Sequence, residues 1–397
     1  MARHVVIVGA GVAGAALAAE LVDGRDVAVT VVERGPRERL LGSTGHAPGF
    51  VGLFNEAPVL IELARISARR YERLSYRGQN GFDRVGGLEV ATTASGMRHL
   101  ARRAALAAGT GLAARLLDPG QAAACAPDLV HPHHCVGGLL FTEDGTARAG
   151  VVTAALKGRA IDGGARFVYD APVNAIEVAG ARVRAVRVLG QRFLADDVVI
   201  ACGIWGPAVA ALAGVRLPLT PVSHPYVYGP RRPAGSVSPP FVRWPEHHVY
   251  ARDHGDRLGL GTYNHVPLSV DVDDLGMDAE RPWPAELFNP AVARALDLLP
   301  AAQRFTVDHR LNGVFSMTAD NQPLVGPVED IAGLWMAEAL WVTHAAGAAH
   351  CLARLMTGAT PVIEGLDSLR PDRFTGQSGD DLVASALRLY RDIYSTA

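Results

Sequence analysis

The chain has 397 residues, of which 49% are hydrophobic, and its formal net charge at pH 7 is −2. This length accommodates two domains with a large core, and a charge this close to neutral argues against nucleic acid as a partner, because phosphate neutralisation needs a basic face. The four cysteines lack C-x-x-C or zinc-finger spacing, which is typical of a reduced, cytoplasmic compartment, and no apolar run is long enough to predict a membrane-spanning helix.

The first predicted elements are a strand over 4–8, a helix that reaches about Val22 and a strand over 27–32. The opening segment MARHVVIVGAGVAGAALAAEL has one basic flank and an apolar run, so it can be mistaken for a signal peptide. Its glycines have G-x-G-x-x-G spacing, however, and a strand follows the helix. The order of strand, glycine turn, helix, strand and acid predicts a folded dinucleotide-binding unit.

Four residues of this unit are expected to hold a dinucleotide. Gly9 permits the tight turn, Gly11 lets a pyrophosphate approach the backbone, and Gly14 lets the helix pack closely on the strand. The N-terminus of the helix offers unpaired N–H groups to the phosphates. The carboxylate of Glu33, at the end of the second strand, can accept hydrogen bonds from a ribose.

The middle of the chain alternates between helices and short strands. Helices are expected over 58–74, from 93 to about 108, over 146–158 and over 205–212, with strands over 86–92, 166–169, 173–178, 183–188, 191–194 and 197–203. The four strands from 166 to 194 are expected to form a small antiparallel set. The apolar strand over 197–203 ends in glycine, which suggests that the nucleotide domain resumes there after an interruption.

A Pro/Gly/Ser-rich loop over 229–240 separates the middle from the last third of the chain. Strands are expected there over 241–244, 248–252, 257–263, 324–326 and 334–337, and helices over 343–356 and 380–394. The strands over 324–326 and 334–337 are expected to be the last strands of the first domain. The final helix is amphipathic.

At this point the pattern resembles a known family. The N-terminal glycine unit, the strand VVIACGIWG and the block GVFSMTADNQPLVGP…GLWMAEALWVTHAAG occur in the order found in D-amino-acid oxidase-like flavoproteins, which include enzymes that oxidise sarcosine and dimethylglycine. The segments STGHAPG, VGGLEVATT, HGDRLGLGTYNH, VDVDDLG and AEALWVTHAAG resemble the bacterial dimethylglycine oxidases. The resemblance extends from residue 4 to about residue 394.

The resemblance implies an α/β fold of two domains, described equally as α+β. A Rossmann-like FAD-binding domain of the glutathione-reductase type is expected to be discontinuous, and a mostly antiparallel β-sheet is expected to form the substrate domain. The expected boundaries are 1–85, 145–215 and 308–375 for the FAD-binding domain, 86–144 and 216–307 for the substrate domain, and 376–397 for the C-terminal helix.

The resemblance also implies FAD as the cofactor and a role for His46. In the dimethylglycine branch the histidine of the S-T-x-H-A-x-G loop is joined covalently to the flavin, and His46 occupies that place. Sarcosine oxidases that attach flavin through a cysteine carry it in the late block, where this chain has Gly313-Val-Phe-Ser316 and no cysteine. The alternative is noncovalent FAD with His46 only packing against it. Further expected cofactor contacts are Arg34, Ser43, Thr44, Val173, Cys202, Trp205, Thr343 and His344.

On the substrate side the resemblance points to His224 and Tyr263 as the pair that accepts or relays the amine proton, or that orients the nitrogen lone pair. Tyr250 and Arg252 lie on the neighbouring expected strand, and Arg252 is a candidate clamp for a substrate carboxylate. The turn that contains Thr343 and His344 opens a helix whose positive end would stabilise a reduced, anionic flavin. His344 itself is expected to be structural or to contact the flavin.

The segment His131-Pro-His-His-Cys135 has side chains suited to a metal ion. No second cluster accompanies it and the resemblance requires no metal, so the sequence favours a solvated loop and no metal site.

The resulting prediction is an FAD-dependent amine oxidase that converts an N-methylglycine-type or related N-substituted amino acid to an imine, which hydrolyses to amine and aldehyde, with O2 reoxidising the flavin to give H2O2. The alternatives are a dehydrogenase with a protein electron acceptor, an oxidase of a different secondary amine in specialised biosynthesis, and a flavin-binding protein without turnover. The dimethylglycine oxidases continue into further domains, including one for tetrahydrofolate, so folate is not expected as a partner of this chain.

Overall fold

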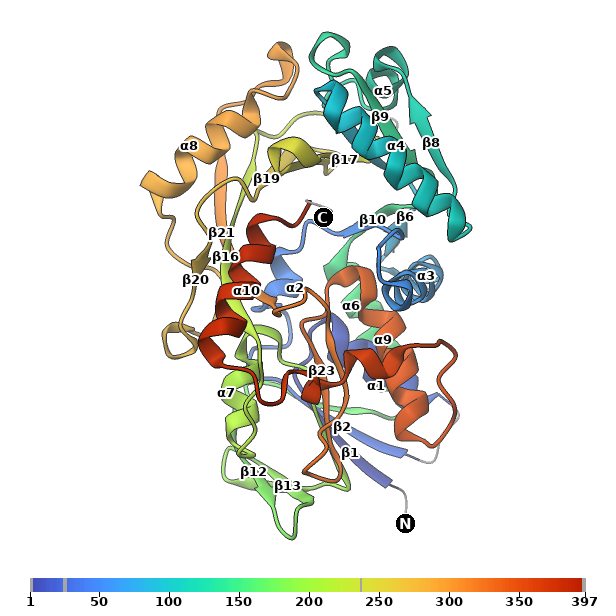
Figure 1. Ribbon diagram of the computed structural model, residues 1–397. Coiled ribbons are helices and arrows are strands. Elements are labelled where there is room, and N and C mark those ends of the chain that lie inside the picture. Colours follow the sequence, from blue (N-terminus) through green and yellow to red (C-terminus); the bar gives the residue numbers. More distant parts are fainter. Residues whose placement is uncertain (1–2, 24–26, 236–237, 395–397) are drawn as a thin grey trace.

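A computed structural model describes residues 3–23, 27–235 and 238–394. Its first layer is a six-stranded sheet in the order β11-β2-β1-β15-β23-β22, seen in the lower part of Figure 1. The strands are β1 (Arg3–Val8), β2 (Val27–Val32), β11 (Arg166–Val168), β15 (Asp197–Ile200), β22 (Leu324–Pro327) and β23 (Leu334–Glu338). All neighbouring pairs are parallel except β22 with β23. This is the nucleotide-binding sheet that the glycine unit predicted.

Side chains alternate between the two faces of this sheet, as the period of a strand requires. Val5 and Ile7 pack into one buried cluster with the helices, whereas Val6 and Val8 pack into another with the small β-meander. The helices are α1 (Val12–Val22), α3 (Pro58–Tyr71), α6 (Ala149–Asp162) and α9 (Val342–Met356), and the meander is β12 (Val173–Val178), β13 (Val183–Val188) and β14 (Gln191–Leu194). The sheet is therefore covered on both sides, which explains its continuous apolar strands.

The second layer is a nine-stranded, mostly antiparallel sheet, seen in the upper part of Figure 1. Its order is β20-β16-β19-β18-β17-β7-β9-β8, and β21 pairs with β16. The strands are β7 (Gly87–Ala91), β8 (Ala114–Leu117), β9 (Gly137–Phe141), β16 (Thr220–Tyr228), β17 (Phe241–Trp244), β18 (Val249–Asp253), β19 (Leu258–Thr262), β20 (Leu268–Ser269) and β21 (His309–Met317). Helices α4 (Ala94–Gly109), α5 (Pro119–Cys125) and α8 (Ala285–Leu296) accompany it.

Short elements connect the two layers. A three-stranded sheet is formed by β3 (Phe50–Val51), β10 (Gly145–Ala147) and β6 (Phe82–Asp83), and a hairpin by β4 (Ser75–Tyr76) and β5 (Gln79–Asn80). Two further short helices are α2 (Ser43–His46) and α7 (Gly206–Ala211). Among the described residues, no helix has both the length and the apolar character needed to cross a membrane.

Three expectations need correction. The strand expected over 166–169 is not part of an antiparallel set, because β11 pairs in parallel with β2 at the edge of the first sheet. The helix expected from residue 146 begins at Ala149, since Thr146 pairs with β3 and β6 in β10. The boundary expected at 308 is also shifted, because β21 hydrogen-bonds along its whole length to β16 of the second sheet.

The C-terminal helix α10 (Gly379–Arg391) lies against the second sheet. It contacts β16 and β21, and Figure 1 shows it in red alongside these two strands. The sequence predicts this helix but not its neighbours, because β16 and β21 were not anticipated as strands. Their pairing forms the surface on which α10 packs.

Candidate active site

One large cavity lies between the two sheets. Its volume is about 640 Å³, within the range of about 300–1,000 Å³ that small-molecule sites occupy. Gly9 and Gly11 line one end, and His224, Tyr250 and Tyr263 line the other. The cavity therefore joins the predicted dinucleotide turn to the predicted substrate residues, which are far apart in the sequence.

The turn between β1 and α1 has no room for a side chain at Gly9 or Gly14. Gly9 has φ 106°, and a Cβ there would lie 2.4 Å from the carbonyl oxygen of Ala201 in the segment after β15. A Cβ on Gly14 would lie 2.0 Å from the carbonyl oxygen of Gly9, so Gly14 serves helix packing and does not itself line the cavity. Gly11 has no side chain to cap α1, and among the described residues only the first amide of the helix, that of Val12, donates to a side chain, Thr44, so the following N-terminal amides are left for an anion. This geometry fits the pyrophosphate of FAD.

Glu33 lies at the end of β2 beside this turn. Its carboxylate accepts hydrogen bonds from the amides of Ala10 at 2.7 Å and Gly35 at 2.8 Å. A carboxylate has further lone pairs for a ribose hydroxyl. The other expected contacts of this region all line the same cavity: Arg34, Val173, Cys202 and Trp205. The Arg34 guanidinium lies 4.7 Å from the centre of the Trp205 ring.

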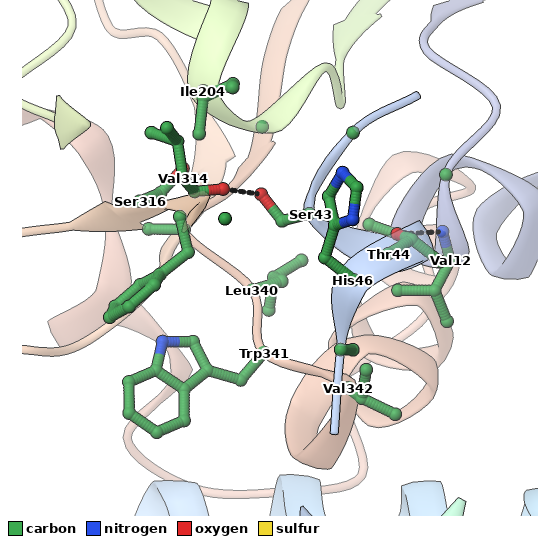
Figure 2. A pocket seen from close by; sticks show the side chains of 18 of the residues that line it. Val12, Ser43, Thr44, His46, Ile204, Val314, Ser316, Leu340, Trp341 and Val342 are labelled. Atoms are coloured by element: carbon green, nitrogen blue, oxygen red, sulfur yellow. Dashed lines mark hydrogen bonds between the residues drawn. The ribbon is translucent and has the colours of Figure 1, made fainter. Parts of the chain in front are cut away.

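The loop that carries His46 is tied to both halves of the molecule. Figure 2 shows Ser43 donating to the carbonyl of Val314 in β21, and Thr44 accepting from the amide of Val12 in α1. These bonds measure 2.8 Å and 3.2 Å. Helix α2 is thereby fixed at the cavity wall, and His46 lines the cavity beside β21.

The ring of His46 has a defined partner. Its Nε2 lies 3.2 Å from Oδ1 of Asp278. Because a carboxylate only accepts, Nε2 carries the proton in the neutral ring and Nδ1 keeps its lone pair. A Cβ built on Gly313 would lie 3.5 Å from the Cβ of His46. The His46 loop and the Gly313 segment, where some sarcosine oxidases carry their flavin-linked cysteine, therefore lie side by side.

The N-terminus of α9 also reaches the cavity through Thr343 and His344. Thr343 donates to the carbonyl of Phe50 at 3.1 Å, and α9 has no side-chain cap on its N-terminal amides. Burial lowers the pKa of His344 to about 4, so this imidazole is neutral at pH 7. The positive end of the helix, rather than a charged His344, is available to an anion here.

At the far end, His224 lies within a cluster of tyrosines. Its Nε2 is 2.8 Å from the Tyr250 hydroxyl and its Nδ1 is 2.8 Å from the Tyr390 hydroxyl. The ring of Tyr263 is 4.4 Å from that of His224. Burial lowers the pKa of His224 well below its usual range, so its imidazole is neutral. The structure thus brings His224, Tyr250 and Tyr263 together at the cavity wall.

The placement of Arg252 argues against its expected role as the carboxylate clamp. Its guanidinium is buried and donates to the carbonyls of Pro48 and Ala147, and the residue is not part of the cavity wall. Arg252 instead joins the His46 loop to β10. Of the arginines on the second sheet, Arg243 on β17 lines the cavity together with His224 and Tyr263, and no signal in the sequence singled it out.

Arg243 carries a charge that its ion pair leaves uncompensated. It donates to Glu89 at 2.7 Å, but both oxygens of Glu89 also accept from Arg103, at 2.9 and 3.0 Å. Two guanidinium groups therefore share one carboxylate. The nearby Asp144 is buried, which raises its pKa to about 7, so it is mostly neutral below that pH. Below that pH the wall therefore keeps a surplus positive charge that suits an anionic ligand.

Glu338 is a buried carboxyl at the end of β23 that lines the cavity and accepts from the amide of Cys202 at 2.6 Å. Its Oε2 has no hydrogen-bond partner among the described residues. Burial raises its pKa to about 8. The group is therefore a neutral acid at pH 7.

We expect Glu338→Gln to make stability less dependent on pH. The folded pKa is raised, so between about pH 4.5 and 8 the unfolded chain loses this proton while the folded protein keeps it, and the wild type loses stability as pH rises. The difference in unfolding free energy between variant and wild type should grow by about 1.4 kcal/mol per pH unit in that window. Denaturant titrations at pH 5 and pH 8 measure it. The exposed Glu329→Gln is the control, and equal slopes in all three proteins would contradict the prediction.

The segment from His131 to Cys135 is a short turn whose His133 and His134 are exposed. In the part of the chain that the structure describes, no group of three or more His, Cys, Asp or Glu side chains is placed to hold a metal ion.

Several residues in and around the cavity were not found from the sequence: Glu89, Arg243, Asp278, Glu338, Tyr390 and Tyr394. Tyr390 and Tyr394 stand four residues apart near the end of the predicted helix, which is the spacing of one helix face. That spacing signals a packed face, but the sequence does not indicate what it packs against.

Known proteins resemble this chain over most of its length. The family model described as "FAD dependent oxidoreductase" (DAO) matches residues 4–355. The chain is 28% identical over 386 residues to 4-methylaminobutanoate oxidase (formaldehyde-forming) of Paenarthrobacter nicotinovorans, covering 94% of this chain and 46% of that protein. It is 26% identical over 389 residues to human mitochondrial dimethylglycine dehydrogenase, covering 93% of this chain and 44% of that protein.

Among solved structures, L-proline dehydrogenase from P. horikoshii superimposes with a TM-score of 0.81 at 19% identity, over 94% of this chain and 97% of that chain. This likeness confirms the predicted fold class. The chain spans less than half the length of the two curated relatives described above.

Proposed function

Because this chain belongs to the family of FAD-dependent oxidoreductases, we propose that it oxidises the C–N bond of an N-methylated or otherwise N-substituted amino acid. FAD, when bound, supplies the acceptor for the hydride equivalent that leaves the carbon next to nitrogen. The imine then hydrolyses to an amine and an aldehyde. The names of the relatives, a formaldehyde-forming 4-methylaminobutanoate oxidase and a dimethylglycine dehydrogenase, support this substrate class.

The observation that carries the proposal is the surplus positive charge of Arg243 in the cavity that also contains His224 and Tyr263. A substrate that bears both a carboxylate and an amine can place the carboxylate at the guanidinium and the nitrogen at the His–Tyr pair. The ring of Phe50 lies 4.6 Å from this guanidinium and fixes its orientation. We therefore assign the carboxylate clamp to Arg243.

The amine must lose its proton before the carbon can release a hydride, because an ammonium nitrogen has no lone pair to stabilise the developing imine. His224 is neutral and buried, so it can accept a proton at Nε2 through the Tyr250 hydroxyl. The Tyr263 hydroxyl has no hydrogen-bond partner among the described residues and lines the cavity. In our proposal it donates to or accepts from the substrate nitrogen and orients it.

We also propose that FAD is attached covalently at His46. The support is chemical: Asp278 accepts the hydrogen bond from Nε2–H, so in the neutral ring Nδ1 keeps its lone pair as the nucleophile at the cavity wall. The matching segment of β21, at Gly313, offers no cysteine as an alternative.

We propose O2 as the electron acceptor, with H2O2 as its product. Lys157, the single lysine of the chain, lies on α6 outside the cavity wall. Reaction with O2 would therefore depend on the N-terminus of α9 and on Arg243 rather than on a lysine. Mixing the reduced protein with air, and with a dye acceptor in parallel, separates an oxidase from a dehydrogenase.

The test of the proposed function is anaerobic bleaching of the flavin by an amine panel. N-methyl amino acids should reduce the wild-type flavin and release formaldehyde, whereas the matching N-methyl amines without a carboxylate should react about 10²-fold more slowly, since they cannot use the Arg243 charge. Arg243→Gln should lose most of this preference, because it slows only the carboxylate substrates.

The matched control is Arg257→Gln, which removes an arginine next to β19 of the same sheet, outside the cavity wall, and should keep the preference. Equal rates for both substrate classes in the wild type would rule out the clamp. Absence of bleaching by every N-substituted amino acid would rule out the proposed substrate class.

A further inference from the structure

We propose that Tyr390 and His265 complete a directed hydrogen-bond chain that carries the amine proton from His224 to the surface of the protein. This inference rests on the proposed function. It gives α10 a part in the reaction, because Tyr390 is the link that this helix contributes. The chain runs from Tyr250 through His224, Tyr390 and His265, and each of its three hydrogen bonds measures 2.8 Å.

The direction of the chain follows from its outer end. Nδ1 of His265 lies 2.8 Å from the carbonyl oxygen of Val266. A carbonyl only accepts, so Nδ1 carries the proton and Nε2 of the neutral His265 ring has a free lone pair. The Tyr390 hydroxyl must therefore donate to this Nε2.

The same logic fixes the inner end. Tyr390 has one hydroxyl proton, which goes to His265, so its oxygen accepts from Nδ1–H of His224. The carbonyl of Ser223 is also near the Tyr390 hydroxyl, but at 3.1 Å it is the more distant acceptor. Nε2 of His224 is then unprotonated and accepts from the Tyr250 hydroxyl. Every polar atom of the chain has a partner in this arrangement.

One proton can pass along this chain without leaving a charge behind. The substrate ammonium gives its proton to the Tyr250 oxygen, whose own proton moves to Nε2 of His224. The Nδ1 proton of His224 moves to the Tyr390 oxygen, and the Tyr390 proton moves to Nε2 of His265. The Nδ1 proton of His265 leaves to water beside Val266. One proton enters and one leaves.

Burial makes such a path necessary. His224 is 7% exposed, Tyr390 0% and His265 9%, but His265 is followed directly by Val266, which is 71% exposed, so the chain ends next to the surface. Burial lowers the pKa of both His224 and His265, so both rings are neutral and each carries one N–H. A stable imidazolium in the middle of the chain would trap the proton.

The surroundings contain little charge that could divert the proton. The titratable groups that act on the members of the chain and on neighbouring Tyr263 are Tyr226, Tyr263, Tyr390, Tyr394, His265 and Arg243. Arg243 is the one permanent charge among them, and it acts on Tyr263. Helix α8 contributes the ring of Phe288, which packs edge-on against His265 at 4.8 Å. The path is therefore apolar apart from its own members.

Tyr390→Phe and His265→Gln test the chain. Phe keeps the ring contacts of Tyr390, including the stacking on Phe315 at 5.7 Å, but removes the hydroxyl. Without the chain, only substrate that arrives as the neutral amine can react, and its fraction falls about tenfold per pH unit below the pKa of the amine. We expect the anaerobic reduction rate of both variants to match the wild type at high pH and to fall about 10²-fold below it at pH 7. A purely structural defect would lower the rate equally at all pH values.

His254→Gln is the matched control. His254 shares a hydrogen bond of the same length, 2.8 Å, with a tyrosine hydroxyl, that of Tyr226, but among the described residues neither side chain hydrogen-bonds to a member of the chain. Its pH profile should follow the wild type. Wild-type pH profiles for Tyr390→Phe and His265→Gln would overturn the proposal.

A second measurement needs no substrate. Nitrogen-15 NMR of histidine-labelled protein reports which ring nitrogen carries the proton, and the His224→Gln and His265→Gln spectra assign the two signals. We expect the proton on Nδ1 in both residues. A proton on Nε2 of either ring would overturn the direction of the chain, even if no amine of the panel reduced the flavin. A failure of the proposed function is therefore distinguishable from a failure of this inference.

Discussion

His46→Ala is expected to release all of its FAD on acid precipitation, whereas the wild-type pellet should stay yellow and its intact mass should exceed that of the chain by one FAD. The variant should still bind FAD, because the Gly9 turn and Glu33 are unchanged and still line the cavity. An alkylated imidazole withdraws electrons from the flavin, so its loss should also lower the flavin potential and slow substrate oxidation.

Asp278→Asn refines this prediction. An amide at this position can bond to either nitrogen of His46, so Nδ1 is no longer reserved as the nucleophile. We expect the variant to attach FAD more slowly but to the same final extent, measured as acid-stable flavin over time after adding FAD to apoprotein. Arg39→Gln, which removes the other side chain paired with Asp278, is the control. A colourless wild-type pellet would disprove the covalent link itself.

His224→Ala should slow anaerobic flavin reduction by about 10²-fold or more, the usual loss for a removed acid–base group. Tyr263→Phe should have an effect of similar size, because it removes the hydroxyl that we place at the substrate nitrogen. Bound FAD should be unchanged in both, since neither residue belongs to the dinucleotide end of the cavity.

Two further measurements make this result specific. Tyr228→Phe removes a hydroxyl from the same strand as His224 but outside the cavity wall, and it should reduce at the wild-type rate. In His224→Ala the limiting rate of flavin reduction should fall while the dissociation constant of the substrate changes little, because the carboxylate clamp remains. Wild-type rates in both His224→Ala and Tyr263→Phe would place the chemistry elsewhere.

The sequence alone determined the nucleotide-binding half of the fold. The order of strand, glycine turn, helix and strand over residues 3–32 is set by local sequence patterns. The turn needs a positive φ at residue 9, and glycine adopts this conformation without steric cost. Continuous apolar runs over 198–201 and 334–337 likewise mark strands buried on both faces. The family resemblance added FAD and pointed to His224 and Tyr263, because those motifs are long.

Only the tertiary structure decided which of two arginines faces the cavity. Arg243 pairs with Tyr250 in the register of β17 against β18, and Arg252 is two residues beyond Tyr250, so alternation places both arginines on the same face of the sheet. Their contacts separate them: Arg252 donates to the carbonyls of Pro48 and Ala147, whereas Arg243 donates to Glu89 and lines the cavity.

The same limit applies to Asp278, Tyr390 and His265. Each forms a hydrogen bond with a residue that is distant in the sequence: Asp278 lies 232 residues from His46, and Tyr390 lies 166 residues from His224. Local sequence signals set helices, turns and strands through backbone geometry and apolar period, whereas a hydrogen bond over such a separation exists only once the sheets have paired and α10 has docked. The dinucleotide-binding turn could therefore be predicted from the sequence, whereas the proposed proton path could be inferred only from the tertiary structure.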